Sequence, residues 1–247
     1  MVCRPTVSMG SAGLIISKVR TSSRILRSSL WLVAAAGALF YAFGWSPAGG
    51  ATSLPDPNID ESPAVAHGRE TVVFAGGCFW GIQAVFEHVR GVTQATAGYS
   101  GGSVRSPSYE EVSSGETGHA ESVEVIYDPS KVTFGQLLKI FFSVAHDPTE
   151  LDRQGPDEGT QYRSAIFYET PDQQRIAQAY VSQLTQAKVF PSPIVTEIVP
   201  FKAFFRAENY HQDYVVHHPD NPYIRINDLP KVANLKKQFP DLYVNDR

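Results

Sequence analysis

From about Glu70 to the C-terminus, the pattern of apolar and polar positions predicts short strands and helices in alternation. Apolar runs rich in Val, Ile, Phe and Tyr predict strands, and apolar positions three and four residues apart predict helices. The predicted strands are 71–75, 92–99, 121–127, 163–168 and 194–199. The predicted helices are 79–90, 134–145, 171–188, 207–216 and 229–238, and two long loops cover 100–120 and 146–162.

Two of these helices carry start signals. Thr133 and Gln136 form a capping-box pair. Thr170 is followed by Pro171 at the first helical position and by Gln173 at the third. The element order contains two β-α-β units with an extra strand between them. It predicts an α+β fold, a two-layer sandwich with a mixed sheet of the split β-α-β (ferredoxin-like) type and long surrounding loops.

The N-terminal part of the chain differs from this pattern. Residues 30–45 are almost wholly apolar, follow a basic stretch and lead into small residues, which is the order of a secretory signal peptide. The apolar stretch is shorter than the roughly 20 residues of a transmembrane helix. We therefore expect export, with a periplasmic or secreted location after cleavage. An uncleaved membrane anchor and an organelle transit peptide are the alternatives.

These boundaries predict four parts. Residues 1–51 form the signal peptide or anchoring tail, and 52–69, with three prolines and little apolar character, form a linker. Residues 70–240 form one globular domain, and 241–247 form a C-terminal tail.

Charge and composition exclude several classes of protein. Residues 1–55 hold five basic residues and no acid; removing these five from the 21 Lys and Arg leaves 16 against 25 acids, a formal net charge of −9. Nucleic-acid binding usually needs a basic face and is disfavoured. Two cysteines exclude a disulfide-rich scaffold, and no Cys/His cluster or Gly-rich phosphate loop predicts zinc or a nucleotide.

One of the two cysteines, Cys78, lies between the first predicted strand and the first predicted helix. Unpaired backbone N–H groups and the positive end of the helix dipole stabilise a thiolate in such a position. Cys78 is therefore a candidate nucleophile. The alternative is a small buried hydrophobic side chain, although Gly76 and Gly77 offer backbone freedom that a packed strand end does not need.

Glu121 is the second informative position. It falls on the same face of its predicted strand as Val123, Val125 and Tyr127. Burial there raises the pKa of the carboxyl, so that Glu121 could keep its proton near neutrality and act as a general acid. A frayed strand end with the carboxylate in solvent is the alternative.

Five further residues could line a site. Tyr109, Asp157 and Tyr162 lie in the two long loops, where a tyrosine hydroxyl could donate to a polar substrate oxygen. Turn or packing roles are the alternative for each. Phe79 and Trp80 directly follow the cysteine and could wall a small alkyl group or pack the core.

The histidines leave another function open. His119 or His146 could combine with Cys78 in a thiol hydrolase, although no spacing selects this arrangement. The three histidines of the polar C-terminal stretch form no metal-binding pattern and are predicted to be surface or capping residues: His211, His217 and His218.

Five sequence motifs occur in order along the chain between about residues 70 and 240. They are Gly77-Cys-Phe-Trp-Gly81, Thr117-Gly-His-Ala-Glu121, His146-Asp-Pro148, Gly155-Pro-Asp-Glu-Gly-Thr-Gln-Tyr-Arg-Ser164 and Tyr210-His-Gln212. Together they resemble the peptide methionine sulfoxide reductase A family. The resemblance implies an oxidoreductase for the S epimer of methionine sulfoxide, free or in protein, and a role in repairing oxidised proteins.

The resemblance also implies roles for the candidate residues. Cys78 is the expected nucleophile and Glu121 the expected proton donor. Three residues are expected to help hold the sulfoxide oxygen and the reacting groups, and two to enclose the S-methyl group: Tyr109, Asp157 and Tyr162 for the first task, Phe79 and Trp80 for the second. The expected products are methionine and a cysteine sulfenic acid, which a second thiol must reduce.

The chain departs from many relatives, which carry resolving cysteines near the C-terminus. No cysteine follows Cys78, and Cys3 lies in the predicted tail. We expect no bound cofactor, and reduction of the sulfenic acid by thioredoxin or another external thiol. We also expect a monomer that contacts a membrane only if the tail is uncleaved. A non-catalytic domain that binds oxidised proteins is a further alternative.

Overall fold

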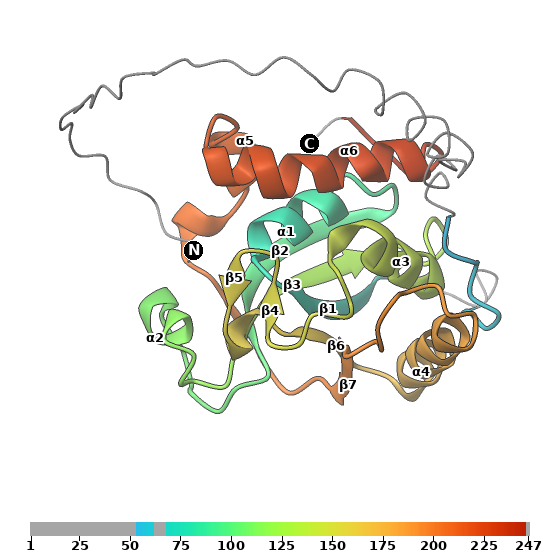
Figure 1. Cartoon of the computed structure of the whole chain (residues 1–247), viewed down its shortest axis with the longest axis horizontal. Coiled ribbons are helices and arrows are strands. Elements are labelled where there is room, and N and C mark those ends of the chain that lie inside the picture. Colours follow the sequence, from blue (N-terminus) through green and yellow to red (C-terminus); the bar gives the residue numbers. More distant parts are fainter. Residues whose placement is uncertain (1–52, 62–67, 246–247) are drawn as a thin grey trace, which may run out of the picture. The chain divides into compact units, whose positions relative to one another are not determined.

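The computed structural model in Figure 1 describes residues 53–61 and 68–245. The predicted signal peptide lies outside the described residues, so it stays a prediction. Within the described ranges, no helix has the length and apolar character needed to cross a membrane.

A six-stranded mixed sheet carries the fold, in the order β7-β6-β1-β3-β2-β8. The strands are β1 (Glu70–Gly76), β2 (Val92–Ser100), β3 (Ala120–Tyr127), β6 (Ser164–Tyr168), β7 (Glu197–Pro200) and β8 (Phe204–Arg206). All neighbours pair antiparallel except β6 and β7, which are parallel. The central order β6-β1-β3-β2 is that of a split β-α-β fold, so the predicted α+β class is confirmed. A separate hairpin joins β4 (Arg153–Gln154) and β5 (Asp157–Glu158).

The helices follow the predicted positions with some changes. The α-helices are α1 (Phe79–Glu87), α2 (Tyr109–Ser113), α3 (Phe134–Ile140), α4 (Pro171–Gln186), α5 (Tyr214–His217) and α6 (Leu229–Gln238). Two π-helical segments, η1 (Phe141–Ala145) and η4 (Ile224–Asp228), adjoin α3 and α6, and two 3₁₀ turns are η2 (Thr160–Tyr162) and η3 (Asn209–His211). Thr133 and Thr170 accept hydrogen bonds from the N–H groups three residues later, so both predicted helix starts are confirmed.

Four sequence predictions differ from the structure. The predicted loop 146–162 contains the hairpin of β4 and β5 and the turn η2. The predicted loop 100–120 contains α2, which a capping box of Ser108 and Glu111 starts. The predicted helix 207–216 is broken into η3 and α5, because Asp213 adopts a left-handed conformation with φ 53°. Strand β8 was not predicted, since three residues carry too little periodicity to be recognised.

The main core lies between one face of the sheet and helices α1, α3 and α4. Strand β1 alternates, with Val72 and Phe74 in this core and Val73 and Ala75 in a smaller cluster on the opposite face. The ring of Phe74 stacks on Phe86 at 5.0 Å.

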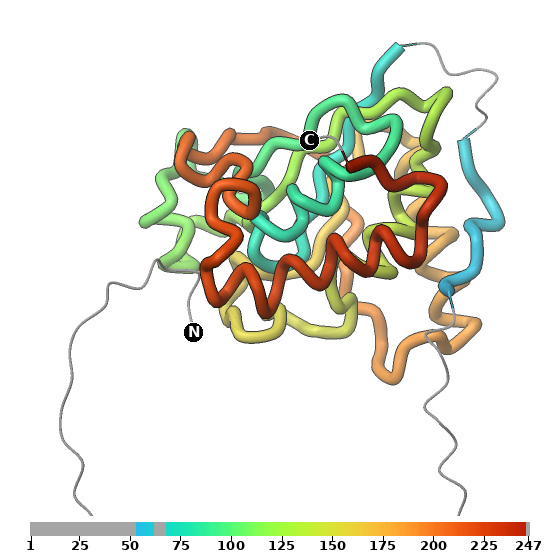
Figure 2. Tube along the Cα trace, turned by 90° about the horizontal axis from the view of Figure 1, so that it is seen from above, coloured from blue at the N-terminus to red at the C-terminus, as the bar shows by residue number. Residues whose placement is uncertain are grey.

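Helix α1 is buried on all sides. The sequence predicts one apolar stripe, but all nine residues of α1 are buried. The reason is a second cover: η4 and α6 run as one continuous helical stretch beside α1, on the side away from the sheet (Figures 1 and 2). This cover brings C-terminal side chains to the start of α1.

Part of the predicted linker contacts the domain. Asp60 accepts hydrogen bonds from Thr133 Oγ1 and from Gly135 N at 2.8 Å, and Glu61 accepts one from Phe134 N at 2.6 Å. Acidic side chains stabilise a helix start, so the segment 53–61 caps α3.

The predicted C-terminal tail also contacts the domain. Arg90 N donates to Leu242 O at 2.6 Å, and Val244 N donates to His88 O at 2.9 Å. These bonds hold residues 242–244 against the end of α1. The division into four parts otherwise stays a prediction.

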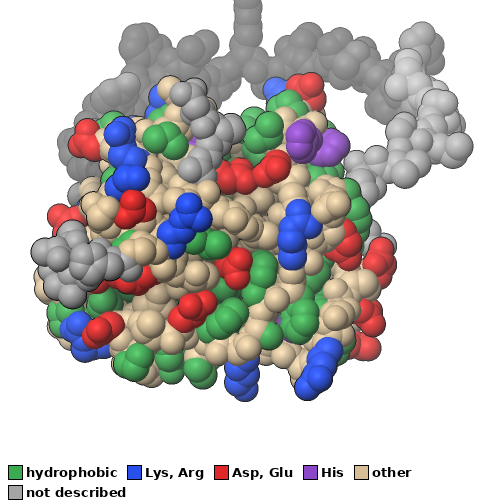
Figure 3. All heavy atoms as spheres, turned by 180° about the vertical axis from the view of Figure 1, so that it is seen from behind, with side chains coloured by type: hydrophobic (Ala, Val, Ile, Leu, Met, Phe, Trp, Pro, Cys, Tyr) green, Lys and Arg blue, Asp and Glu red, His purple; other side chains and the backbone are tan. Residues whose placement is uncertain are grey.

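Figure 3 shows the face of the molecule opposite to the view of Figure 1. On the described part of this face, acidic and basic side chains are interspersed among polar and hydrophobic ones. No continuous basic patch is present there of the kind that binds nucleic acid.

Candidate active site

Cys78 occupies the turn between β1 and α1, as predicted, and is the N-cap residue of α1. Gly77 has φ +94°, and a Cβ atom there would lie 2.5 Å from the side chain of Gln154. Glycine is therefore required both by backbone conformation and by space. The turn holds Cys78 in a buried position with 1% of its surface exposed.

Glu121 lies at the same helix start. Its Oε2 atom accepts a hydrogen bond from Phe79 N at 3.0 Å, and the residue is fully buried at the end of β3 that adjoins this turn. Burial, reinforced by the charges of Asp157 and Asp228, raises the pKa of Glu121 to about 8. The Oε1 atom has no hydrogen-bond partner among the described residues. Glu121 can therefore carry a proton on Oε1 at neutral pH.

Asp157 lies on β5 and Tyr162 on η2, in the predicted loop 146–162. The Tyr223 hydroxyl donates to Asp157 Oδ2, and burial raises the pKa of Asp157. Asp157 acts on the pKa of Glu121 by its charge, so the two carboxyls are close enough to interact. Tyr162 is fully buried in the main core that also contains Cys78.

Three predicted site residues gather around an unpredicted one, His211. Its ring lies 4.4 Å from the ring of Tyr109, 5.1 Å from Phe79 and 5.8 Å from Trp80. Trp80 also stacks on Tyr214 at 3.8 Å. We call these rings the aromatic wall: Phe79, Trp80, Tyr109, His211 and Tyr214. Two of them, Phe79 and Trp80, directly follow the candidate nucleophile Cys78 in the sequence.

The prediction for His211 was wrong. It is 2% exposed, and its Nδ1 atom accepts a hydrogen bond from Trp80 Nε1 at 3.2 Å. Burial lowers the pKa of His211 to about 4, so the ring is neutral. The motif Tyr210-His-Gln212 was the available signal, but its polar setting favoured the surface. His217 and His218 are exposed, as predicted.

The other two histidine candidates have both ring nitrogens engaged. His119 Nδ1 accepts from Gly102 N at 3.1 Å, and Nε2 contacts Val104 O at 2.8 Å. His146 Nδ1 contacts Phe141 O at 3.1 Å, and Nε2 contacts Ser164 Oγ at 2.8 Å. Neither ring therefore has a nitrogen available as the base of a thiol hydrolase.

Comparison with known proteins agrees with this geometry. The model of the family described as peptide methionine sulfoxide reductase matches residues 70–243. The chain belongs to this family.

Relatives and solved structures of reductases are similar over the same domain. The chain is 62% identical to MsrA 2 of Mesorhizobium japonicum, over 72% of this chain and 91% of that protein. It is 53% identical to MsrA 2 of Synechocystis, over 76% of this chain and 89% of that one. The structure of methionine sulfoxide reductase A of Corynebacterium diphtheriae is 39% identical, with a TM-score of 0.54, over 62% of this chain and 76% of that chain.

The reductase fold also places near α1 two residues that the sequence did not identify as site residues. Asp228, the last residue of η4, is fully buried, and Lys231 follows one turn later on α6. Their ion pair lies against α1 at Gly81. No local sequence pattern identifies these residues as site residues, because the sequence predicts only an ordinary polar helix in this C-terminal segment.

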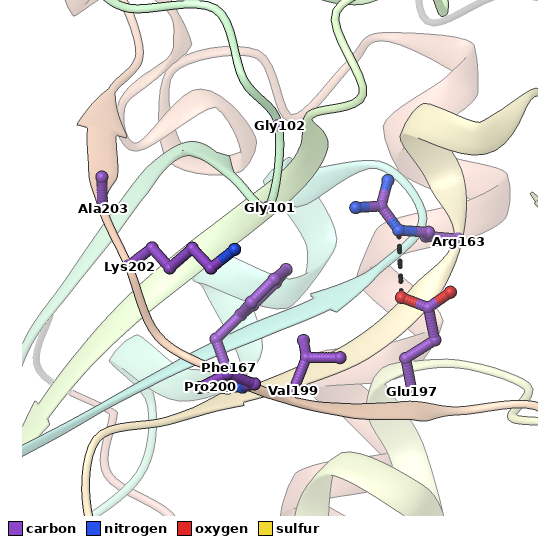
Figure 4. Close-up of a pocket in the computed structure, with 9 residues that line it drawn as sticks. All are labelled: Gly101, Gly102, Arg163, Phe167, Glu197, Val199, Pro200, Lys202 and Ala203. Atoms are coloured by element: carbon purple, nitrogen blue, oxygen red, sulfur yellow. Dashed lines mark hydrogen bonds and ion pairs between the residues drawn. The ribbon is translucent and has the colours of Figure 1, made fainter.

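A hollow in the reductase lies on the other face of the sheet (Figure 4). Its nine lining residues are Gly101, Gly102, Arg163, Phe167, Glu197, Val199, Pro200, Lys202 and Ala203. Phe167 belongs to the small cluster opposite the core that contains Cys78, and Arg163 pairs with Glu197 at 3.4 Å. None of the predicted site residues lines this hollow.

Within the described ranges, no group of three or more His, Cys, Asp or Glu residues could hold a metal ion.

Proposed function

We propose that this reductase converts the S epimer of methionine sulfoxide, free or in oxidised proteins, into methionine, with Cys78 as nucleophile and Glu121 as acid. One observation carries the proposal. The backbone N–H that follows Cys78, on Phe79, donates to Glu121 Oε2 at 3.0 Å. The attacking sulfur and the acid are thereby held at one helix start, and Oε1 of Glu121 is buried without a hydrogen-bond partner among the described residues, which leaves it able to donate a proton to a substrate oxygen.

The two groups perform one balanced step. The Cys78 thiolate attacks the sulfoxide sulfur while Glu121 gives its proton to the sulfoxide oxygen, which is otherwise a poor leaving group. The attack forms a bond between Cys78 Sγ and the sulfoxide sulfur. The protonated oxygen then leaves that sulfur and bonds to Sγ as the sulfur–sulfur bond breaks, which gives a sulfenic acid on Cys78 and methionine, whose sulfur gains the two electrons that Cys78 loses. Glu121 then takes a proton from solvent.

The surrounding residues orient the substrate. Asp157 adjoins the acid, and together with Tyr109 and Tyr162 it holds the sulfoxide oxygen and the reacting groups. Phe79 and Trp80 enclose the S-methyl group. The aromatic wall around His211 supports the second role, since buried rings offer an apolar surface of the size of a methyl group.

Regeneration requires an external thiol. No cysteine follows Cys78 in the sequence, so a thioredoxin-like protein or a small thiol attacks the sulfenic acid, releasing water and forming a mixed disulfide. A second thiol of the reductant then frees Cys78. Signal cleavage would remove Cys3, and the exported monomer would act in the periplasm or outside the cell.

A single-turnover experiment tests the proposal. Reduced protein without reductant is mixed with each sulfoxide epimer separately. We expect one methionine per protein from the S epimer, none from the R epimer, and an added oxygen atom on Cys78 by mass spectrometry. Cys78→Ser is the control without a nucleophile. A Cys3–Cys78 disulfide as the main product would contradict the external resolution.

The single-turnover experiment, together with a hydrolase assay of Glu121→Gln, separates the alternatives. A non-catalytic domain for oxidised proteins would release no methionine in the first turnover. A thiol hydrolase would retain its activity in Glu121→Gln, and it would need a histidine with a free ring nitrogen near Cys78.

A further inference from the structure

The ion pair of Asp228 and Lys231 lies at the start of α6, with Asp228 fully buried and Lys231 partly buried, and it has no part in the step above. Asp228 Oδ1 lies 3.4 Å from Lys231 Nζ, and the two side chains are 0% and 18% exposed. Neither carboxylate oxygen of Asp228 has a hydrogen-bond partner among the described residues. Burying a carboxylate costs folding free energy, and one ammonium group offsets this cost only in part. Stabilisation of the fold is therefore a weak explanation for this ion pair.

The pair lies against the first turn of α1. A Cβ atom at Gly81 would lie 2.1 Å from Asp228 Oδ1 and 3.0 Å from Lys231 Nζ. The absence of a side chain at Gly81 therefore lets both charged groups approach the helix backbone. Gly81 belongs to the same Gly77–Gly81 motif as the nucleophile.

This position is also close to Cys78. A helix rises about 1.5 Å per residue, so the third residue after the N-cap lies within one turn of it. Gly81 is three residues after Cys78, the N-cap of α1. Charges next to Gly81 therefore act on the thiol across one helical turn, in a buried region where they are weakly screened.

Other titratable groups face the same turn from the remaining elements. Glu121 on β3 and Asp157 on β5 both interact with Asp228 by charge. Lys231 acts by charge on Asp157 and on the neutral His146. Tyr109 and Tyr162 lie in the main core, Tyr223 packs against it, and the buried ring of His211 is neutral. Lys231 is thus a cation that opposes the burial of two acidic residues here, Asp157 and Asp228.

We propose that Asp228 and Lys231 are positioning residues of the reaction: as a charge pair they set the electrostatic potential at the first turn of α1, and thereby the balance between thiol and thiolate at Cys78. Asp228 disfavours the thiolate and holds Lys231 in place. Lys231 favours the thiolate and offsets the surrounding carboxyls.

This inference rests on the proposed function only for the role of Cys78. Its test therefore measures the thiol itself, without sulfoxide or turnover. The background is Cys3→Ser, so that Cys78 is the single cysteine. The rate of alkylation by iodoacetamide is measured between about pH 5 and pH 10, since only the thiolate reacts.

Opposite shifts are expected from the two substitutions. Lys231→Met removes a positive charge and should raise the apparent pKa of alkylation by about one unit. Asp228→Asn removes a negative charge and should lower it by a similar amount. The double variant should return close to the starting value, and Lys231→Arg should keep it. Damage to the fold would not produce shifts of opposite sign that cancel.

Lys237→Met is the matched control, because Lys237 lies on the same helix at an exposed position. It should leave the alkylation profile unchanged. Shifts in one direction for both variants, or shifts below about 0.2 units, would overturn the proposal. Circular dichroism checks the fold, and Lys231→Gln replaces Lys231→Met if the latter is unfolded. A normal alkylation result without methionine formation would instead count against the proposed function.

Discussion

The two sides of the first turn of α1 carry buried carboxyls in different settings. On the sheet side, Glu121 accepts one hydrogen bond from Phe79 N and faces no cation. On the C-terminal side, Asp228 accepts no hydrogen bond from a described residue but has Lys231 at 3.4 Å. Both residues are fully buried.

The difference shows how equal burial can lead to different protonation. Burial raises the pKa of Glu121 to about 8, and that of Asp228 to about 6 because Lys231 opposes the effect. At neutral pH, Glu121 is mostly protonated and can act as an acid. Asp228 is mostly charged and can act on its surroundings only through its field.

The largest expected effect is a difference in reaction rate between substitutions of the two carboxyls, Glu121 and Asp228. Glu121→Gln should slow methionine formation about 10²–10⁴-fold, because it removes the transferable proton and keeps the shape. Asp228→Asn should change the rate by about tenfold or less at neutral pH. The measurement is the single-turnover rate with the S epimer at pH 7. A Glu121→Gln rate within tenfold of the unmodified protein would remove Glu121 from the role of acid.

The second effect concerns the packing of the C-terminal side. Gly81→Ala should lower the free energy of unfolding by about 1–3 kcal/mol, because its methyl group would overlap Asp228. Urea unfolding measures this loss. In an Asp228→Ala background the overlap is gone, so the same substitution should cost much less. Equal costs in the two backgrounds would show that the contact does not limit the packing.

The third effect compares the two carboxyls by the pH dependence of stability. The pKa of Glu121 is about 8 in the folded protein against an ordinary 4.5, so the folded state binds the extra proton between these values. The free energy of unfolding should therefore fall as pH rises from about 5 to 8, by up to ~1.4 kcal/mol per pH unit. Glu121→Gln should remove this slope, whereas Asp228→Asn should change only the part below about pH 6. Urea unfolding at several pH values is the measurement.

The smallest effect lies away from both carboxyls. His211→Phe removes the acceptor for Trp80 Nε1 and keeps an aromatic ring. The loss of about 1 kcal/mol for one hydrogen bond should raise KM about fivefold and leave kcat nearly unchanged. Steady-state kinetics with the S epimer measure both constants. A large fall in kcat with unchanged KM would indicate that His211 takes part in the chemical step.

Much of the fold followed from local patterns. Alternation of Val and Phe in β1 and the caps at Thr133 and Thr170 placed strands and helices within a few residues of the observed bounds. Such signals are local, since they depend on side-chain period and on hydrogen bonds between near neighbours. The short elements α2 and β8 were not predicted, because segments of five and three residues carry little periodicity.

The candidate site was predictable to the extent that its residues are marked in the sequence. Cys78 between glycines and Glu121 on an apolar face stand out locally, and the structure places both at one helix start. His211 was assigned to the surface because its neighbours in sequence are polar. Its burial depends on Trp80 and Tyr109, which are distant in the chain.

The sequence by itself determined the family, the order of most elements and the two candidates for the reacting pair, because motifs and periodicity are properties of neighbouring residues. It also shows that no cysteine follows Cys78 in the given sequence. Only the tertiary structure decided what surrounds that pair. Asp228 and Lys231 reach Gly81 because η4 and α6 pack across α1, a contact between segments about 150 residues apart that no local pattern specifies.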